Sequence, residues 1–394
     1  MTLTIPCLRR FREIGVLLLV ILAPYLFGFE SLAWAAAGED LVYVGTYTEH
    51  GSKGIYVYRF DSTNGQVTAL GLAAESTQPS FLAVDPSEHF LYAVNEVDSY
   101  KSQHTGAVSA FAIDPATGKL SLLNQVSSRD AGPAHIALDQ AGKYVLVSNY
   151  TLGSVAVFPL LPDGRLGDSS AFVQHKGSSI NADRQEGPHA HAVAMAPDNR
   201  FAIVADLGLD KLIVYPFDPA TGMLGKEPNI TKTRAGAGPR HLVFDPSGKF
   251  LYVINELQSS VVSYSYDATR GELHELKTAS TLPEKFTANN DAAEIAVHPS
   301  GKFLYASNRG HDSIAVFSID SAKGTLTRVE FIPTKGKTPR NFAIDPTGSW
   351  LLVANQASDN IVVFRIDSKT GHLTPSGQVL SVSSPVCVKF VPLP

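Results

Sequence analysis

Cysteine is scarce in this sequence of 394 residues, which contains only Cys7 and Cys387. Cys7 lies in an N-terminal segment that we expect to be removed, so the mature chain cannot form an intramolecular disulfide. Its stability must therefore come from the fold. Cys387 lies between Val386 and Val388 in an apolar strand pattern, which favours a buried, inert thiol over a nucleophile.

The sequence also lacks a large excess of charge of either sign. Its formal net charge is -5, only 18% of its residues are charged, and no block of like charge occurs. A nucleic-acid groove or a polybasic membrane surface needs such a block, so we expect neither partner. The 44% of hydrophobic residues, with 31 Gly and 24 Pro, instead favour a compact, turn-rich protein.

One apolar run stands out, at residues 15–29 near the N-terminus. Arginines precede it at positions 9, 10 and 12, and small residues follow it, which is the order of a secretory signal. We predict that residues 1–37 are a signal peptide, cleaved after Ala35 or Ala37, and that the protein is periplasmic or extracellular. The alternative is a retained anchor, but Pro24 interrupts the run, which is shorter than the ~20 residues that span a bilayer. We expect no stable membrane insertion after cleavage.

The chain repeats itself about every 50 residues, the period of propeller blades. A Gly-containing turn after a short apolar strand occurs in seven places, at Asn64-Gly65, Thr117-Gly118, Asp163-Gly164, Thr221-Gly222, Arg270-Gly271, Lys323-Gly324 and Thr370-Gly371. Each unit also has a strand, an Asp-Pro-like turn, a second strand, a polar loop and a third strand, for example 242–244, 250–254 and 260–266. No helix of useful length is expected after residue 37.

The Asp-Pro-like turn occurs in six complete units, and the seventh unit is split between the two ends of the chain. Residues 41–45 correspond to the second strand of a unit and residues 386–391 to a first strand. Pairing these strands would close the ring and leave no open edge. We therefore predict an all-β, seven-bladed β-propeller over residues 38–394, in preference to an open β-solenoid, and we expect a monomer.

Residues that belong to the strands nearest the axis should converge at the end of the propeller opposite the Asp-Pro turns. Five residues before each turn position come Ser80, Ala134, His191, Arg240, Ala293 and Arg340, followed by Phe81, His135, Ala192, His241, Glu294 and Asn341. The second strands end in Asn95-Glu96, Asn149-Tyr150, Asp206-Leu207, Asn255-Glu256, Asn308-Arg309 and Asn355-Gln356. This end is where we predict the functional site.

Two kinds of residue in these sets have alternative interpretations. Most of the repeated Asn residues have a structural explanation, because an Asn amide bonds to backbone at turns. Arg240, Glu256, Arg309 and Arg340 break the repeat individually, which favours function, although salt bridges between blades are the alternative. His189 and His191 have the spacing of residues on one face of a strand. They could bind a metal, but the nearby arginines favour a hydrogen-bonding or acid/base role, and we predict no metal site.

In several segments the chain resembles the seven-bladed lactonases, which include bacterial propeller-type 6-phosphogluconolactonases and a fungal carboxymuconate lactonizing relative. The matching segments are Gly187-Pro188-His189-Ala190-His191, Ala205-Asp206-Leu207-Gly208-Leu209-Asp210, Gly238-Pro239-Arg240-His241, Ile254-Asn255-Glu256-Leu257, Ala293-Glu294-Ile295, Ser307-Asn308-Arg309-Gly310-His311-Asp312 and Thr338-Pro339-Arg340-Asn341-Phe342. Any one of them is weak evidence, but the joint pattern is specific and covers essentially the whole mature chain.

The resemblance implies hydrolysis of a sugar lactone, with the active-site positions of the relative matched by Arg240, Glu256, Arg309 and either His189 or His191. The chemistry agrees, because lactone hydrolysis needs an activated water and donors for the carbonyl oxygen. We expect Glu256 to be the general base, the two arginines to bind the oxyanion and substrate anion, and one histidine to transfer or orient a proton. We further expect Arg340, Asn308 and Asp206 to bind substrate, and no cofactor to be needed.

Three other functions remain open at this point. The propeller could bind a ligand or partner without catalysis, or it could close an unsaturated diacid to a lactone with the same side chains. A metal-dependent lactonase is disfavoured because the chain lacks a compact acidic and Asn ligand cluster. The expected signal peptide also bears on the substrate, because the phosphogluconolactonases of central metabolism act in the cytoplasm.

Overall fold

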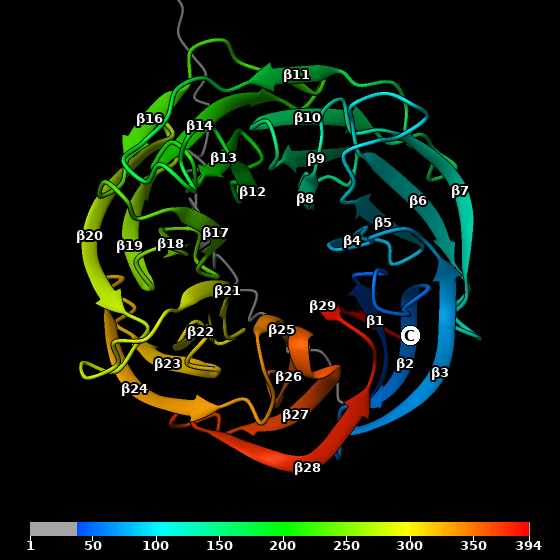
Figure 1. The fold of residues 1–394 in the computed structure, drawn as a ribbon, viewed down its shortest axis with the longest axis vertical. Coiled ribbons are helices and arrows are strands. Elements are labelled where there is room, and N and C mark those ends of the chain that lie inside the picture. Colours follow the sequence, from blue (N-terminus) through cyan, green and yellow to red (C-terminus); the bar gives the residue numbers. More distant parts are fainter. Residues whose placement is uncertain (1–37, 394) are drawn as a thin grey trace, which may run out of the picture. The chain divides into compact units, whose positions relative to one another are not determined.

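A computed structural model describes residues 38–393, so the predicted signal peptide at 1–37 lies outside the described residues. The described chain forms seven antiparallel sheets arranged in a ring around a central axis (Figure 1). Within this part of the chain the only helical segment is the 3-10 turn η1 (Gln356–Ser358). No helix in the same part is long and apolar enough to cross a membrane. The prediction of a seven-bladed, all-β propeller is confirmed.

The blades are numbered here in chain order, and their strands run from the channel outward. Blade 1 contains β29 (Pro385–Pro392), β1 (Glu39–Thr46), β2 (Gly54–Asp61) and β3 (Gln66–Glu75). Blade 2 contains β4 (Leu82–Val84), β5 (Phe90–Asn95), β6 (Ala107–Ile113) and β7 (Leu120–Ser127). Blade 3 contains β8 (Pro133–Leu138), β9 (Tyr144–Asn149), β10 (Ser154–Pro159) and β11 (Ala171–Gln174).

Blade 4 contains β12 (Ala190–Met195), β13 (Phe201–Asp206), β14 (Lys211–Asp218), β15 (Met223–Leu224) and β16 (Asn229–Lys232). Blade 5 contains β17 (Pro239–Phe244), β18 (Phe250–Asn255), β19 (Ser260–Asp267) and β20 (Glu272–Ser280). Blade 6 contains β21 (Asp291–Val297), β22 (Phe303–Arg309), β23 (Ser313–Ile319) and β24 (Leu326–Pro333). Blade 7 contains β25 (Pro339–Ile344), β26 (Trp350–Asn355), β27 (Asn360–Ile366) and β28 (Leu373–Ser381).

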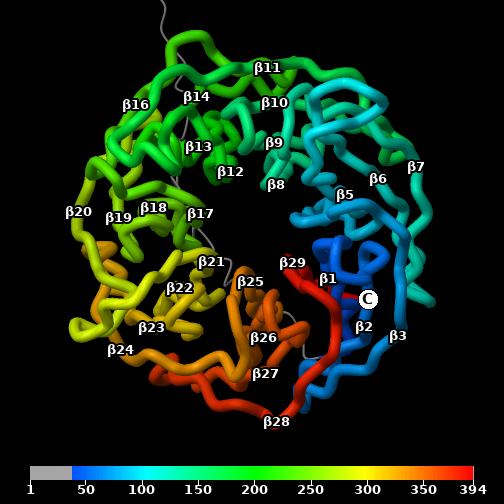
Figure 2. Tube along the Cα trace, in the orientation of Figure 1, coloured from blue at the N-terminus to red at the C-terminus, as the bar shows by residue number. Residues whose placement is uncertain are grey.

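The two ends of the chain share blade 1, as the sequence predicts. The C-terminal strand β29 pairs antiparallel with β1, with Val42 opposite Phe390, and β1 pairs on its other side with β2. Figure 2 shows the red C-terminal strand on the channel side of the blue N-terminal strands. Closure leaves no open sheet edge between the first and last blades, which protects the ring against edge-to-edge association.

The repeated turns have two structural roles at the end of the ring opposite the site. In the Asp-Pro turns the aspartate accepts backbone N–H groups; Asp245, for example, accepts that of Phe250 at 2.8 Å. Each Gly turn contacts the preceding blade; for example, Tyr92 of blade 2 donates a hydrogen bond to the carbonyl of Gly164 of blade 3 at 3.0 Å. A Cβ on Gly164, whose φ is +82°, would lie 2.3 Å from the Phe90 ring, so only glycine fits.

Candidate active site

Beta-bulges at the start of the innermost strands aim side chains into one end of the channel. The pairing register shifts at this point in six of these strands, β29, β8, β12, β17, β21 and β25. A bulge inserts an unpaired residue and redirects its side chain. The unpaired residues include His191, Arg240 and Arg340, which occupy the same position in blades 4, 5 and 7. The bulge position therefore carries two of the charged exceptions to the repeat, Arg240 and Arg340.

A second ring of side chains comes from the residue that follows each second strand. The repeated Asn lies at or next to the end of the strand, and the residue after it lines one cavity in four blades, as Glu96, Tyr150, Glu256 and Arg309. This cavity has a volume of about 240 Å³ and is lined by Glu96, Ala134, Tyr150, Arg184, His191, Glu256, Asp291, Arg309 and Arg340. The cavity thus combines two repeated positions with residues of the connecting loops, and it is our candidate site.

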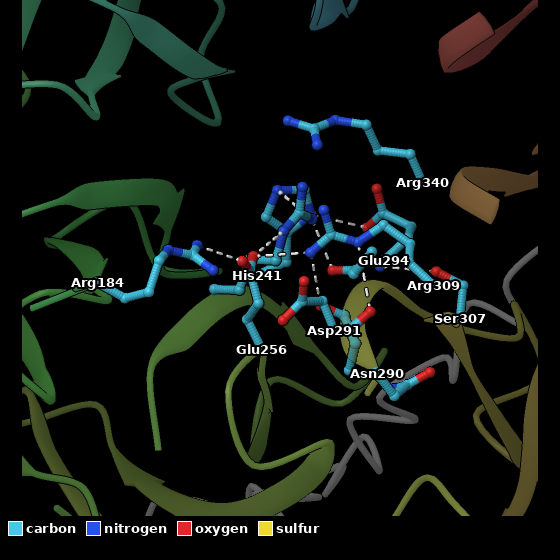
Figure 3. Close-up of polar contacts among 12 residues, drawn as sticks. Arg184, His241, Glu256, Asn290, Asp291, Glu294, Ser307, Arg309 and Arg340 are labelled. Atoms are coloured by element: carbon cyan, nitrogen blue, oxygen red, sulfur yellow. Dashed lines mark hydrogen bonds and ion pairs between the residues drawn. The ribbon is translucent and has the colours of Figure 1, made fainter. Parts of the chain in front are cut away.

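Glu256 lies at the centre of an arginine cluster. Its Oε1 is 2.6 Å from Nη2 of Arg184, and its Oε2 is 2.9 Å from both Nε of Arg240 and Nη2 of Arg309. Figure 3 shows Arg184 and Arg309 approaching Glu256 from different strands and loops. Burial alone would raise the pKa of Glu256, but Arg309, Arg240 and Arg184 outweigh it and lower the pKa to about 2. Glu256 is therefore a firmly held carboxylate.

Arg340 lies across the cavity from this cluster (Figure 3). Its Nη2 donates a 2.7 Å hydrogen bond to the hydroxyl of Tyr47, which in turn donates to Glu96 at 2.9 Å. Burial disfavours the charged form, but Tyr47, Glu96 and Glu256 together raise the pKa of Arg340. Among residues 38–393, Arg340 is the one cavity arginine with no carboxylate in salt-bridge contact. Its remaining donors are available to an anionic ligand.

His191 lines the cavity, whereas His189 does not. The Nδ1 of His191 is buried and has no hydrogen-bond partner within the described chain. Burial, and then the positive charges of Arg240 and other neighbours, lower its pKa well below the usual value. His191 is therefore a neutral imidazole near neutral pH, at the wall of the cavity.

The side chain of His189 is held by other groups. Its Nδ1 lies 2.9 Å from the carbonyl of Tyr150 and its Nε2 lies 3.2 Å from Glu186, while its ring stacks on Tyr150. The expectation that strand alternation places both histidines on one face assumes a regular strand. The register instead shifts between Ala190 and Ala192, because His191 is the bulged residue. The structure therefore separates their roles.

Besides His189, three predicted site residues lie outside the cavity lining. Asp206 accepts the backbone N–H groups of His189 and Leu209 and lies 2.5 Å from Nδ1 of His175. The Asn308 amide donates to the carbonyl of Thr281 at 2.7 Å, which is the structural use of the repeated Asn. Both side chains are fully buried, so substrate contact is not supported for either. Arg240, 2% exposed, lies beneath the cavity and reaches it only through Glu256.

Sequence reasoning did not select Arg184, Tyr47, Tyr150, Glu96 and Asp291. Tyr47, Glu96 and Tyr150 follow the second strands of their blades, the same position as Glu256 and Arg309, and this shared position was a usable signal. Arg184 lies in the connection at residues 175–189, which has no counterpart in the other blades. Its position is set by neighbours such as Gln185, which donates to the carbonyl of Leu207 at 2.8 Å. No repeat could have revealed it.

Neither a metal nor a cofactor has an evident set of ligands at this site. Residues 38–393 contain no group of three or more His, Cys, Asp or Glu side chains arranged to hold a metal ion. The arrangement instead offers a neutral imidazole, several guanidinium groups and a cavity large enough for a small polar molecule. Such a set suits an anionic substrate whose reaction develops negative charge on oxygen.

Comparisons with known proteins agree with the fold. The family described as "Lactonase, 7-bladed beta-propeller" matches residues 41–390. A 6-phosphogluconolactonase of Bacillus subtilis is 38% identical over 349 residues, covering 89% of this chain and 97% of its own. Two solved structures are similar over the same region. A putative 6-phosphogluconolactonase from Bacteroides fragilis has a TM-score of 0.84 at 38% identity, covering 90% and 98% of the two chains. The periplasmic gluconolactonase of Pseudomonas aeruginosa has a TM-score of 0.85 at 35% identity, covering 91% and 100%.

Proposed function

The chain belongs to the seven-bladed β-propeller lactonase family and is a lactone-hydrolysing enzyme, and we propose that it opens a six-carbon sugar lactone in the cavity beside His191. The relatives named above support a gluconolactone or its 6-phosphate as substrate. The observation that carries the proposal is a neutral imidazole at the wall of a cavity that is also lined by arginines.

We assign the proton transfers to His191. A water molecule attacks the lactone carbonyl carbon while the imidazole takes its proton, and the imidazolium then returns that proton to the ring oxygen as the acyl C–O bond breaks. The product is a hydroxy acid, which releases its proton to solvent. Arg309, which lines the cavity, is suited to stabilise the negative charge that develops on the carbonyl oxygen.

We assign Glu256 a positioning role, in place of the general-base role expected from the sequence. Three arginines already engage its two oxygens, so neither oxygen is free to accept a proton from water. Its charge instead fixes Arg184 and Arg309 at the cavity wall. The carboxylate is needed for the reaction because it arranges the donors.

We assign Arg340 to the anionic end of the substrate. Its fork of donors suits a phosphate or a carboxylate, and its single hydrogen bond to Tyr47 leaves most of that fork free. A phosphorylated lactone carries such an anion before the reaction, whereas a plain gluconolactone acquires one only as product. Arg340 therefore favours the phosphorylated substrate in this proposal.

The test is the rate of hydrolysis of 6-phosphoglucono-δ-lactone and glucono-δ-lactone by the purified protein, corrected for spontaneous opening. His191→Asn should lower kcat about 100-fold or more, the usual scale for loss of a general base. His189→Asn is the matched control and should retain most of the parent kcat. Equal losses in the two variants would contradict the role of His191, and a parent rate equal to the blank for both lactones would contradict the substrate assignment.

We also propose that residues 1–37 direct export. The support is the order of arginines, apolar run and small residues in the sequence, together with the similarity to a periplasmic gluconolactonase. N-terminal sequencing of the protein recovered from its native cells should begin after Ala35 or Ala37. Recovery of the uncleaved chain from the cytoplasm would refute export.

A further inference from the structure

A buried layer of side chains lies directly beneath the cavity. It is formed by the residues that follow the bulge position, among them Phe81, His135, His241, Glu294 and Asn341. Phe81 packs on both imidazoles, and the centroids of the His135 and His241 rings are 5.1 Å apart. His241, Glu294 and Asn341 add polar groups to this layer although they are almost fully buried. Buried polar groups of this kind need partners, and their hydrogen bonds form one chain.

The direction of every hydrogen bond in this chain follows from one backbone group. The N–H of Val388, in the closing strand β29, donates to Oδ1 of Asn341 at 2.8 Å. The amide nitrogen of Asn341 must then be the group that donates to Oε2 of Glu294. The other oxygen of Glu294 lies 3.1 Å from Nδ1 of His241, which therefore carries the proton. The Nε2 of His241 is left as an acceptor, 3.2 Å from Nη1 of Arg240.

Arg240 is the link between this layer and the cavity. Its Nη1 also donates to the carbonyl of Ala293 at 2.7 Å. Its Nε lies 2.9 Å from Glu256, although that N–H is not aimed for a hydrogen bond, so the contact is ionic. The guanidinium is thus oriented from below by His241 and Ala293, while it places a positive charge against Glu256. Burial lowers the pKa of His241 to about 4, so the imidazole stays neutral and able to accept.

We propose that His241 and Glu294 are positioning residues for the lactonase reaction: Glu294 fixes the tautomer of His241, which orients Arg240, which in turn holds Glu256 and the cavity arginines. This inference rests on the proposed role of the Glu256 cluster. It extends the functional network from the mouth through blades 5, 6 and 7 to the closing strand. Neither His241 nor Glu294 lines the cavity, so both act through Arg240.

A matched pair of histidines tests the proposal. His135 and His241 occupy the same position in blades 3 and 5, in contact with each other, but only His241 hydrogen-bonds to Arg240. His241→Asn should lower kcat about 10- to 100-fold with little change in KM, because the arginines act mainly on the charge of the transition state. His135→Asn should leave the kcat of the folded protein within about threefold of the parent, since it removes packing alone.

The conservative variant His241→Gln provides a second test, because a purely structural role of His241 would not predict a recovery of kcat in this variant. The amide oxygen of Gln reaches the place of Nε2, where it can accept from Arg240, whereas that of Asn cannot. His241→Gln should therefore recover part of the kcat lost in His241→Asn, while the same two substitutions at His135 should behave alike. Thermal unfolding of all four variants separates loss of fold from loss of rate.

Glu294→Gln tests the tautomer with almost no change in volume. Asn341 already points a donor at this side chain, so the Gln oxygen must face Asn341 and its NH₂ must face His241. The imidazole is then driven to carry its proton on Nε2, against the N–H of Arg240. Nitrogen-15 spectra of histidine-labelled protein should show His241 protonated at Nδ1 in the parent and at Nε2 in the variant, with a kcat at least tenfold lower.

The outcomes separate this inference from the proposed function. An inactive parent would overturn the proposed function, whereas the tautomer of His241 can still be read from the spectra. Equal kcat values in His241→Asn and His135→Asn, or an unchanged kcat in Glu294→Gln, would overturn the positioning role. If His241→Asn fails to fold, the Glu294→Gln result decides.

Discussion

At the residue scale, one carboxylate balances several buried cations. Glu256 is 3% exposed and contacts three arginines, so its charge offsets much of their mutual repulsion. Burial, followed by the charges of Arg309 and Arg340, already lowers the pKa of Arg240 to about 9. Removing the carboxylate would leave these cations without their shared partner, which is the costly way to break a buried ion pair.

We therefore expect Glu256→Gln to lower both activity and stability. Loss of the arginine arrangement should reduce kcat about 100-fold, and the uncompensated cations should lower the free energy of unfolding by roughly 3 kcal/mol. Kinetics and urea denaturation of the purified variant measure the two effects. Glu186→Gln, at an exposed carboxylate on the neighbouring loop, is the control and should change neither by much. A stable but inactive Glu256→Gln would favour the general-base role instead.

Arg340→Met is expected to discriminate between substrates. Loss of a charge-assisted contact of about 1.5–3 kcal/mol should reduce kcat/KM for the phosphorylated lactone about 10- to 100-fold. The plain lactone should lose less, because it carries no anion before the reaction. Lys337→Met removes an exposed cation that pairs with Asp312 and controls for long-range charge. A loss of the same size for both lactones would show that Arg340 acts on the reacting carbonyl.

At this scale the sequence identified the charged residues, but it did not indicate the position of each one relative to the cavity. Arg240, Glu256, Arg309 and Arg340 stand out because each departs from its repeat. The pattern could not separate His189 from His191, because the bulge that distinguishes them is a feature of backbone pairing. It could not place Arg240 below the cavity either, since depth along the channel depends on packing between blades.

At the element scale, the bulges at the start of six innermost strands place differing side chains at one repeated position. The segment before β17 illustrates how the bulge is held. Gly238 has a φ of +65° and its N–H donates to Asp210 at 2.8 Å, while the side chain of Asp210 also accepts from Ser179 of the loop that carries Arg184. One aspartate thus links the Arg240 bulge to the Arg184 loop.

Gly238→Ala is expected to disturb this link. A Cβ here would lie 2.6 Å from the side chain of Leu257, next to Glu256, and the left-handed backbone adds strain of about 1 kcal/mol. We expect loss of stability beyond that strain and a kcat several-fold lower. Gly377→Ala is the matched control, because Gly377 has a φ of +91° but no atom within 4 Å of the added Cβ. Thermal unfolding and kinetics compare them, and equal losses would mean that crowding at Leu257 is unimportant.

At the scale of the whole molecule, the repeats predicted the blade count, the shared first blade and the end at which the charged side chains gather around one cavity. These features follow from the period of the turns and from the complementary half-units at the termini, so they could be read without side-chain detail. Blade 4 departs from the pattern, because its outer edge is divided between β15 and β16 around Gly225 and Pro228. The insertion that carries Arg184 follows no period, so its course had to come from the structure.

The ring closure contains a buried acidic group with a pH-dependent effect on stability. Asp40 lies in β1, opposite Pro392 of β29, and is 6% exposed. Burial, followed by the charges of Asp345 and Glu88, raises its pKa to about 7. Between about pH 4 and pH 7 the unfolded chain ionises this carboxyl while the folded chain keeps it protonated. The free energy of unfolding therefore falls as pH rises through this range and stays lower above it.

Asp40→Asn should remove this fall in the free energy of unfolding. Relative to the parent, the variant should be nearly unchanged at pH 4 and more stable at pH 8, by on the order of 2–4 kcal/mol for a shift of this size. Urea unfolding at a series of pH values measures the difference, and exposed Asp183→Asn controls for the change of net charge. A constant difference from pH 4 to pH 8 would mean that Asp40 titrates normally. A stability difference that grows toward pH 7 would show that ionisation of Asp40, in the β1–β29 strand pair, destabilises the folded protein and that protonation removes this effect.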